Sequence, residues 1–323
     1  MANRYAFQTF TIPGTKGSVS IAGLNDFGGI TGSQTQGFPN DPYPEAWIDK
    51  NGTAIVYGAI GAPYGQHSTG GAINNLGQTV GSSGHYAQTA RGYLYSGGSF
   101  IRIQGPQDGY FTSAYGINDR GQVVGTMLPN SGPGTSQAFV WKNGAVTQSF
   151  SYPGANSTAA NGINDNGRVV GIYTLPNEGS FHDHGFLWAN GRLTPIDVRG
   201  AQSTDPKAIN NQGQVAGTYY DGTHYHGFIK QIGNGQMTFI NGPGATDTTV
   251  NAINDFGQVA GSYTDAAGVA HDFIATPGNG NNLASLAEMA PLPAVVQRLT
   301  GASTGHAFFD PSQPVTVVAV AHA

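Results

Sequence analysis

The sequence predicts an all-β protein, a six-bladed β-propeller with four antiparallel strands in each blade. First, a motif of the form Gly-Ile-Asn-Asp-x-Gly recurs in six recognisable copies, with its Asn at positions 25, 74, 118, 164, 210 and 254. The resulting spacing of 44 to 49 residues is typical of radial repeat architectures. Second, turn glycines separate short apolar runs along the chain, which indicates many short strands joined by hairpins.

The fourth copy shows the strand order most clearly. Residues 159–164 and 168–173 form two strand-like runs around the turn Asp165-Asn166-Gly167. Residues 184–188 and 193–197 form a third and a fourth run around Asn190-Gly191. Four such runs in each repeat predict a small twisted sheet, that is, a propeller blade. A parallel β-helix is the alternative, although its rungs are usually shorter and lack a hairpin in every repeat.

The ends of the chain indicate how the ring closes. The last repeat has three strand-like runs and no fourth run, whereas residues 6–14 resemble the fourth-strand segment 236–244. We therefore expect the N-terminal strand to complete the last blade and residues 1–280 to form the propeller. Residues 281–323 lack the repeat pattern and form a C-terminal tail, with a short helix near 283–289 and a strand near 314–320. We expect this tail to pack on the propeller, to compete with the N-terminal strand for closure, or to serve as an export signal.

Composition excludes several classes of function. Only 10% of the residues are charged and the formal net charge is -5, so no basic stripe is available for nucleic acid. No apolar run reaches the roughly 18 residues needed to span a bilayer. The absence of cysteine removes disulfides, thiol catalysis and zinc–thiolate sites and leaves the redox compartment open.

Two motifs in fixed order carry a family resemblance. The repeat Gly-Ile-Asn-Asp-x-Gly-Gln-Val-Val-Gly-x-Tyr, followed by His-Gly-Phe-Leu-Trp, resembles the bacterial HAF-repeat family over about residues 5–278. This resemblance implies a secreted, extracellular β-rich repeat protein and supplies no catalytic residues. The chain departs from the motif at its His position, where only the last three repeats carry His. From the first repeat to the sixth, the residues at this position are Glu45, Arg91, Gln137, His184, His226 and His271.

The Asn-Asp pairs of the repeats have two interpretations. Carboxylates beside turn glycines resemble calcium loops, but one carboxylate in each turn falls short of the six to eight oxygen ligands that calcium takes. Side chains that bond the backbone of their own turn are the favoured interpretation. We expect no cofactor and no metal site.

Two His-x-His pairs carry the clearest chemical signal. His182 with His184, and His224 with His226, each project from one face of a strand and are suited in principle to metal binding or general base catalysis. For the His of the repeat motif, hydrogen bonding that caps a blade loop is the favoured role. His182 and His224 lie outside the repeat pattern and are the better functional candidates.

The lengths of the connections predict which face binds. Turns between the first and second strands, and between the third and fourth, are uniformly tight, whereas the other connections are long, irregular and rich in Tyr, Asp, His and Asn. Long loops on a rigid scaffold usually carry recognition. We expect the ligand contacts to come from this loop face. Arg91 and Tyr86 lie on one side of the ring, and the main contact residues lie across from them, namely His182, His184, His224, Tyr225 and His226.

Two functions remain open. The first is a non-catalytic extracellular binding or matrix module for a polysaccharide or a surface protein. The second is a carbohydrate-active enzyme, specifically a polysaccharide lyase in which His or Tyr abstracts a proton and Arg91 or a metal neutralises a carboxylate. The sequence contains no G-x-S-x-G, H-E-x-x-H or phosphate-loop motif and favours the binding module.

Overall fold

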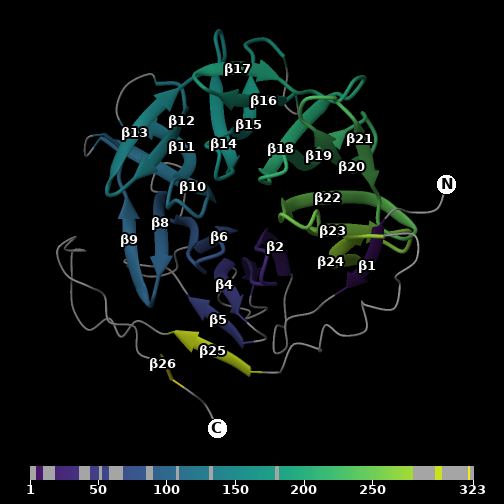
Figure 1. The fold of residues 1–323 in the computed structure, drawn as a ribbon, viewed down its shortest axis with the longest axis horizontal. Helices are drawn as coiled ribbons and strands as arrows, with labels where there is room; N and C mark the ends of the chain where they lie inside the picture. The colour runs from purple at the N-terminus through teal and green to yellow at the C-terminus, as the bar shows by residue number, and fades with distance from the viewer. Residues whose placement is uncertain are drawn as a thin grey trace.

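The chain forms six four-stranded antiparallel blades around a central axis (Figure 1). The computed structural model describes residues 5–9, 19–35, 44–50, 53–57, 68–84, 90–106, 109–130, 134–178, 182–278, 295–299 and 319–320. The predicted all-β six-bladed propeller is confirmed, with the first strand of each blade nearest the axis. In the fourth repeat, all four predicted strands are present.

The strands follow the chain blade by blade. Blade 1 contains β2 (Val19–Leu24), β3 (Ile30–Thr35), β4 (Pro44–Lys50) and β5 (Thr53–Tyr57). Blade 2 contains β6 (Ser68–Ile73), β7 (Thr79–Ser83), β8 (Arg91–Ser96) and β9 (Ser99–Ile103). Blade 3 contains β10 (Tyr110–Ile117), β11 (Val123–Pro129), β12 (Gln137–Lys142) and β13 (Ala145–Phe150).

The remaining blades repeat this order. Blade 4 contains β14 (Ser157–Ile163), β15 (Val169–Thr174), β16 (His184–Ala189) and β17 (Arg192–Pro195). Blade 5 contains β18 (Ser203–Ile209), β19 (Gln214–Tyr220), β20 (Tyr225–Gln231) and β21 (Met237–Ile240). Blade 6 contains β22 (Ala245–Ile253), β23 (Val259–Asp265) and β24 (Ala270–Pro277), and β1 (Tyr5–Thr9) is its fourth strand.

The N-terminal strand closes the ring, as predicted. β1 pairs antiparallel with β24, and the register runs from Tyr5 opposite Pro277 to Thr9 opposite Phe273. Phe7 packs against Phe273 with ring centroids 4.9 Å apart. Backbone pairing and aromatic packing therefore join the two ends of the repeat array in one sheet, which leaves no unpaired edge on β24.

Two short strands of the C-terminal tail lie at the outer edge of blade 1 (Figure 1). β25 (Val295–Leu299) pairs parallel with β5, and β26 (Ala319–Val320) pairs antiparallel with β25. The expected short helix at 283–289 lies outside the described residues. Within the part of the chain that the structure describes, no helix is long and apolar enough to cross a membrane.

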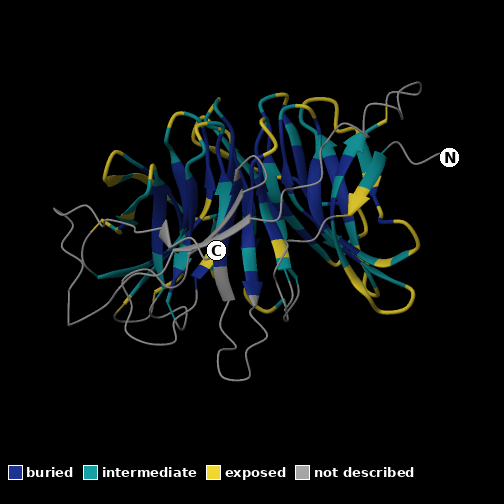
Figure 2. Cartoon of the chain, turned by 90° about the horizontal axis from the view of Figure 1, so that it is seen from below, coloured by how far each residue is buried: buried dark blue, intermediate teal, exposed yellow. Residues whose placement is uncertain are grey.

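The core lies between the blades. Figure 2 shows buried residues concentrated along the strands and exposed residues at the connections on the two faces. The third strand of every blade contributes at least one almost fully buried aromatic residue to this core, and the aromatic residues at the Phe position of the motif are Trp47, Tyr93, Phe139, Phe186, Phe228 and Phe273. Each is worth roughly 1.5–3 kcal/mol of apolar burial, so the Phe of the repeat motif is a packing residue.

Candidate functional site

The two faces of the propeller are built by different connections. Turns between first and second strands and between third and fourth strands form one face, which we call the turn face. Connections between second and third strands and between one blade and the next form the other, which we call the loop face. The turns obey fixed backbone geometry: Gly167, for example, has a positive φ of 71° that non-glycine residues rarely adopt.

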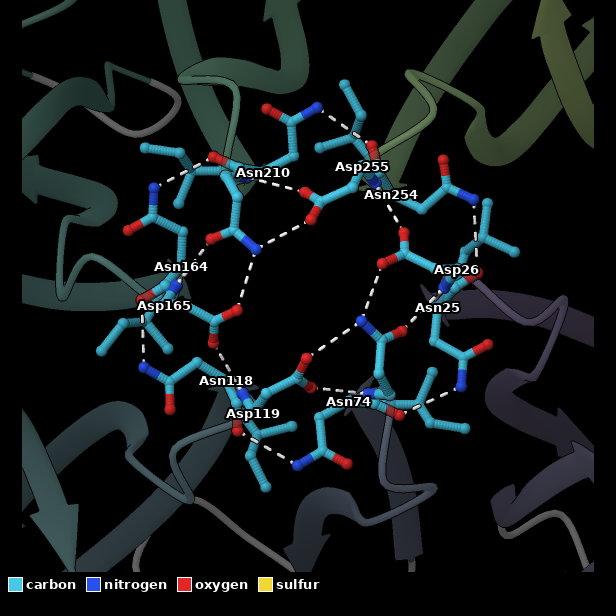
Figure 3. A pocket seen from close by; sticks show the side chains of 18 residues that line it. Asn25, Asp26, Asn74, Asn118, Asp119, Asn164, Asp165, Asn210, Asn254 and Asp255 are labelled. Carbon is cyan, nitrogen blue, oxygen red and sulfur yellow. Dashed lines mark hydrogen bonds between the residues drawn. The ribbon is translucent and has the colours of Figure 1, made fainter.

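Six Asn side chains join neighbouring blades on the turn face (Figure 3). In blade 4, Oδ1 of Asn164 accepts hydrogen bonds from the backbone N–H groups of Asn166 and Arg168, and its Nδ2 donates to the backbone oxygen of Asn210 in blade 5. All six blade junctions contain this Nδ2–oxygen bond, at 2.9–3.3 Å, including the closing junction from Asn254 to Asn25. The interpretation of the motif Asn as a turn-capping residue is confirmed.

The residue after each Asn forms a second ring inside the first. Its Oδ1 accepts the backbone N–H of the equivalent residue in the preceding blade at 2.7–2.9 Å. Nδ2 of Asn75 bridges Asp26 and Asp119, and Nδ2 of Asn211 bridges Asp165 and Asp255. Sequence reasoning missed this inner ring, although the Asp or Asn after every anchor is visible in the sequence.

Four carboxylates therefore surround the axis on the turn face. They converge on a small cavity of about 80 Å³, which the Asn, Asp and apolar residues of the six turns enclose. Among the described residues, no cluster of three or more His, Asp or Glu side chains is arranged to hold a metal ion. The hydrogen bonds instead give the inner ring a role in joining the blades.

On the loop face, the His of the repeat motif holds a connection in place. Nε2 of His184 lies 2.9 Å from Oε2 of Glu178, Nδ1 lies 2.9 Å from Oδ2 of Asp197, and the ring stacks on Tyr173. Burial alone lowers the pKa of His184, but the hydrogen bonds to Asp197 and Glu178 outweigh it, so the pKa is raised. His184 thus ties both flanking connections of blade 4 to its third strand.

Blades 5 and 6 repeat this arrangement. His226 stacks on Tyr219 and pairs with Asp221 at 3.0 Å, and His271 stacks on Tyr263 and pairs with Asp265 at 2.8 Å. The backbone N–H of His224, then that of Thr223 and the His226 ring, lower the pKa of Asp221 to about 2. His184 and His226 are therefore loop-capping residues, as their place in the repeat predicts.

His224 and Tyr225 lie beside the first strand of blade 6. The backbone N–H of Tyr225 donates to Oδ1 of Asp247, and Nδ1 of His224 lies 3.6 Å from the same oxygen. The hydrogen bond from Tyr225 is the main cause that lowers the pKa of Asp247. The Tyr225 side chain is 40% exposed and tilts against Tyr220, with ring centroids 4.9 Å apart.

His182 adjoins the same aromatic pair through Gln202. Nε2 of His182 lies 3.3 Å from Nε2 of Gln202, and the backbone N–H of Gln202 donates to the oxygen of Tyr220. Nδ1 of His182 is buried and has no hydrogen-bond partner among the described residues. We call the combined surface the Tyr220–Tyr225 patch, and its members are His182, Gln202, Tyr220, His224, Tyr225 and Asp247.

Three residues of the patch, Tyr220, Gln202 and Asp247, are not among the ligand-contact residues that the sequence predicts. Tyr220 ends β19 and was visible as one of a Tyr-Tyr pair at the start of a loop. Gln202, by contrast, precedes β18 and meets Tyr220 through backbone pairing within blade 5, and Asp247 lies in β22 of blade 6, where a contact between blades brings it to Tyr225. Neither residue is close in the sequence to the residues that were expected to contact the ligand, so no sequence pattern indicated that they belong to the patch.

Arg91 lies at the start of β8 in blade 2, away from the patch. Its guanidinium carbon lies 4.9 Å from the ring centroid of Phe111, and Nη1 donates to the backbone oxygen of Ala90. Burial, and then the charge of Arg102, lowers the pKa of Arg91. Tyr86 lies outside the described residues. The structure therefore groups His182, His224 and Tyr225 and places Arg91 in a separate environment.

The carboxyl group of Asp183, next to His182 in the chain, has a raised pKa. Burial, and then the charge of Asp205, raises the pKa of Asp183, while Lys207 and the neighbouring His side chains oppose this shift. Asp205 is itself paired with Lys207 and accepts a hydrogen bond from Asn161. Two carboxyl groups thus lie close together in different electrostatic environments.

Comparison with solved structures identifies relatives in fold. TolB from Acinetobacter baumannii matches 79% of this chain and 65% of its own length, with 14% identity and a TM-score of 0.50. The β-propeller domain of the Trilobed protease from Pyrococcus furiosus matches 81% of this chain and 96% of its own, with 9% identity and a TM-score of 0.45. The SapL1 lectin, solved with alpha methyl fucoside, matches 84% and 95%, with 11% identity and a TM-score of 0.47.

These likenesses concern the fold alone. No protein-family model and no curated protein matches the chain. The strand order and the comparisons therefore establish the fold of the chain, which is a six-bladed β-propeller.

Proposed function

We propose that the protein is a non-catalytic extracellular binding module whose loop face binds carbohydrate at the Tyr220–Tyr225 patch. The observation that carries this proposal is the exposed Tyr225 ring, which is held against Tyr220 at 4.9 Å and has hydrogen-bonding side chains on both sides. An extracellular location rests on the resemblance of the repeats to the HAF family, which we propose as the family of this chain.

The chemistry of the patch suits a sugar ring. A pyranose presents C–H groups on one face and hydroxyl groups around its edge. Tyrosine offers a rigid apolar ring with a polar tip, and the amide, imidazole and carboxylate groups of Gln202, His224 and Asp247 supply donors and acceptors for hydroxyls. The fixed backbone position of Tyr225 limits the entropy lost on binding.

A glycan array probed with the purified full-length chain tests this proposal. We expect a discrete group of glycans to bind the native protein, and Tyr225→Ala to weaken their binding at least about tenfold, or roughly 1.4 kcal/mol. Phe239→Ala is the matched control, because Phe239 is also an exposed aromatic side chain of blade 5, on the fourth strand. Equal losses in the two variants, or no glycan bound, would contradict the proposal.

The enzyme alternative has one supporting observation, the raised pKa of Asp183 beside Asp205, Lys207 and His182. A carboxyl group with a raised pKa is suited to proton transfer. Incubation of the protein with uronate polymers, monitored by the ultraviolet absorbance of unsaturated ends, tests for a lyase. Product formation that Asp183→Asn abolishes would favour the enzyme over the binding module.

A further inference from the structure

Three large apolar side chains project from the turn face. Phe27, Phe256 and Leu76 are 74%, 68% and 66% exposed, the highest values among the large hydrophobic residues that the structure describes. All three occupy the same position, the third residue of the Asn-Asp-x-Gly or Asn-Asn-x-Gly turn. Blades 6, 1 and 2 are adjacent around the ring, so these residues form one surface, which we call the apolar crescent.

The fold does not require apolar residues at this position. The same turn in blades 3, 4 and 5 carries Arg120, Asn166 and Gln212, all exposed, and the backbone N–H two residues after each of them still donates to Oδ1 of the anchor Asn. The backbone N–H of Phe27, for instance, donates to Oδ1 of Asn25 in the same way as that of Asn166 donates to Asn164. Exposed apolar side chains that the scaffold does not use mark an interaction surface.

The apolar crescent borders the four axial carboxylates. Phe27 directly follows Asp26, Phe256 follows Asp255, and Leu76 follows Asn75, so each apolar residue is a chain neighbour of an inner-ring residue. Asp26, Asp119, Asp165 and Asp255 form no ion pair with any described residue, although each accepts hydrogen bonds within the ring. An apolar arc therefore adjoins a concentrated negative charge at the axis.

From this juxtaposition we propose that the turn face docks a segment of a partner protein that presents a cationic group, flanked by apolar side chains. The cationic group lies over the axial carboxylates, and the apolar side chains pack on Phe256, Phe27 and Leu76. Charge complementarity selects this occupant. A second copy of this chain stacked on the same face would bring two rings of four carboxylates together, and an anionic membrane surface would be repelled in the same way.

The experiment pans a displayed random peptide library against the full-length protein, with counter-selection on the triple variant Phe27→Asn, Leu76→Gln and Phe256→Asn. These replacements introduce residue types that the same turn already carries in blades 4 and 5, so folding is retained. We expect enriched peptides to carry Lys, Arg or a free amino end beside apolar residues, and a Lys→Gln exchange in them to weaken binding at least about tenfold. Binding should also weaken as salt rises.

A matched control variant changes two uncharged residues of the opposite arc, Asn166→Ser and Gln212→Ser, and should bind the peptides as the native protein does. The proposal is overturned if no peptide distinguishes the native protein from the triple variant, or if the enriched peptides are acidic or lack a cationic group. Sedimentation that shows a dimer of the native protein, lost in the triple variant, would assign the surface to a second copy and would also overturn it.

Discussion

At the scale of single residues, Asn164 shows why the repeat motif is so regular. One amide group closes its own turn through Oδ1 and binds the next blade through Nδ2. Asn carries an acceptor oxygen and a donor nitrogen as two separate atoms of one short side chain, whereas an ionised Asp at this position has no donor for the next blade. The residue that looks like a metal ligand in the sequence is a structural junction.

We expect Asn164→Ala to lower the free energy of unfolding by about 2–3 kcal/mol, because it leaves two backbone N–H groups without their acceptor and removes one of the two hydrogen bonds that the Asn210 carbonyl accepts. Urea denaturation followed by circular dichroism measures this loss. Asn166→Ala, an exposed change in the same turn, should stay within about 0.5 kcal/mol of the native protein. Similar losses for both variants would contradict the junction role of Asn164.

Asp272 provides a second prediction at this scale. It stands where blades 4 and 5 have Gly185 and Gly227, whose added Cβ atoms would lie 2.8 Å from Pro206 and 2.5 Å from Val250 in the next blade. Burial raises the pKa of Asp272 to about 7. Because the folded state prefers the protonated form, the contribution of this group to stability is complete below the unfolded pKa of about 3.9 and is lost as the pH rises through about 7.

We therefore expect Asp272→Asn to raise the melting temperature by a few degrees at about pH 8 and to leave it nearly unchanged at about pH 4. Thermal melts of both proteins across this range provide the test. A gain that is the same at every pH would show that the carboxyl group does not titrate in this window.

At the scale of strands, close packing explains the glycine in the second strand of each blade. A Cβ atom on Gly171 in β15 would lie 2.0 Å from the backbone oxygen of Ala159 in β14. We expect Gly171→Ala to destabilise the protein by about 2–3 kcal/mol. Gly92→Ala in β8 is the control, since its nearest neighbour would be 3.3 Å away. The measurement is again urea denaturation, and equal effects at both sites would contradict this explanation.

The closing strand has its own test. Deletion of residues 1–9 removes β1 and exposes the edge of β24, and we expect a lower melting temperature together with aggregation. Size-exclusion chromatography and thermal melts measure these effects. A truncated protein that stays monomeric and melts as before would show that β1 contributes little to closure.

At the scale of the whole molecule, the fold was more predictable than the site. The regular Asn positions and Asn-Gly turns give strand order, blade number and ring closure, because each is encoded locally and repeated. The Tyr220–Tyr225 patch depends instead on contacts between blades, such as that of Tyr225 with Asp247, and these have no sequence signal. Likewise, the sequence shows Phe27, Leu76 and Phe256, but only the structure shows that they are exposed on one face.

The Asn junctions of the turn face hold the ring together, and we propose that the loop face binds glycans. The most direct measurement compares two variants for melting temperature and for binding to the glycans found on the array. We expect the double variant His182→Ala with His224→Ala to change the free energy of unfolding by less than about 0.5 kcal/mol, so that its melting temperature is nearly unchanged. The same variant should weaken glycan binding. Asn164→Ala should lower the melting temperature and, below that temperature, bind glycans normally. Normal binding by the His double variant, with binding lost in folded Asn164→Ala, would show that the two faces have been assigned in reverse.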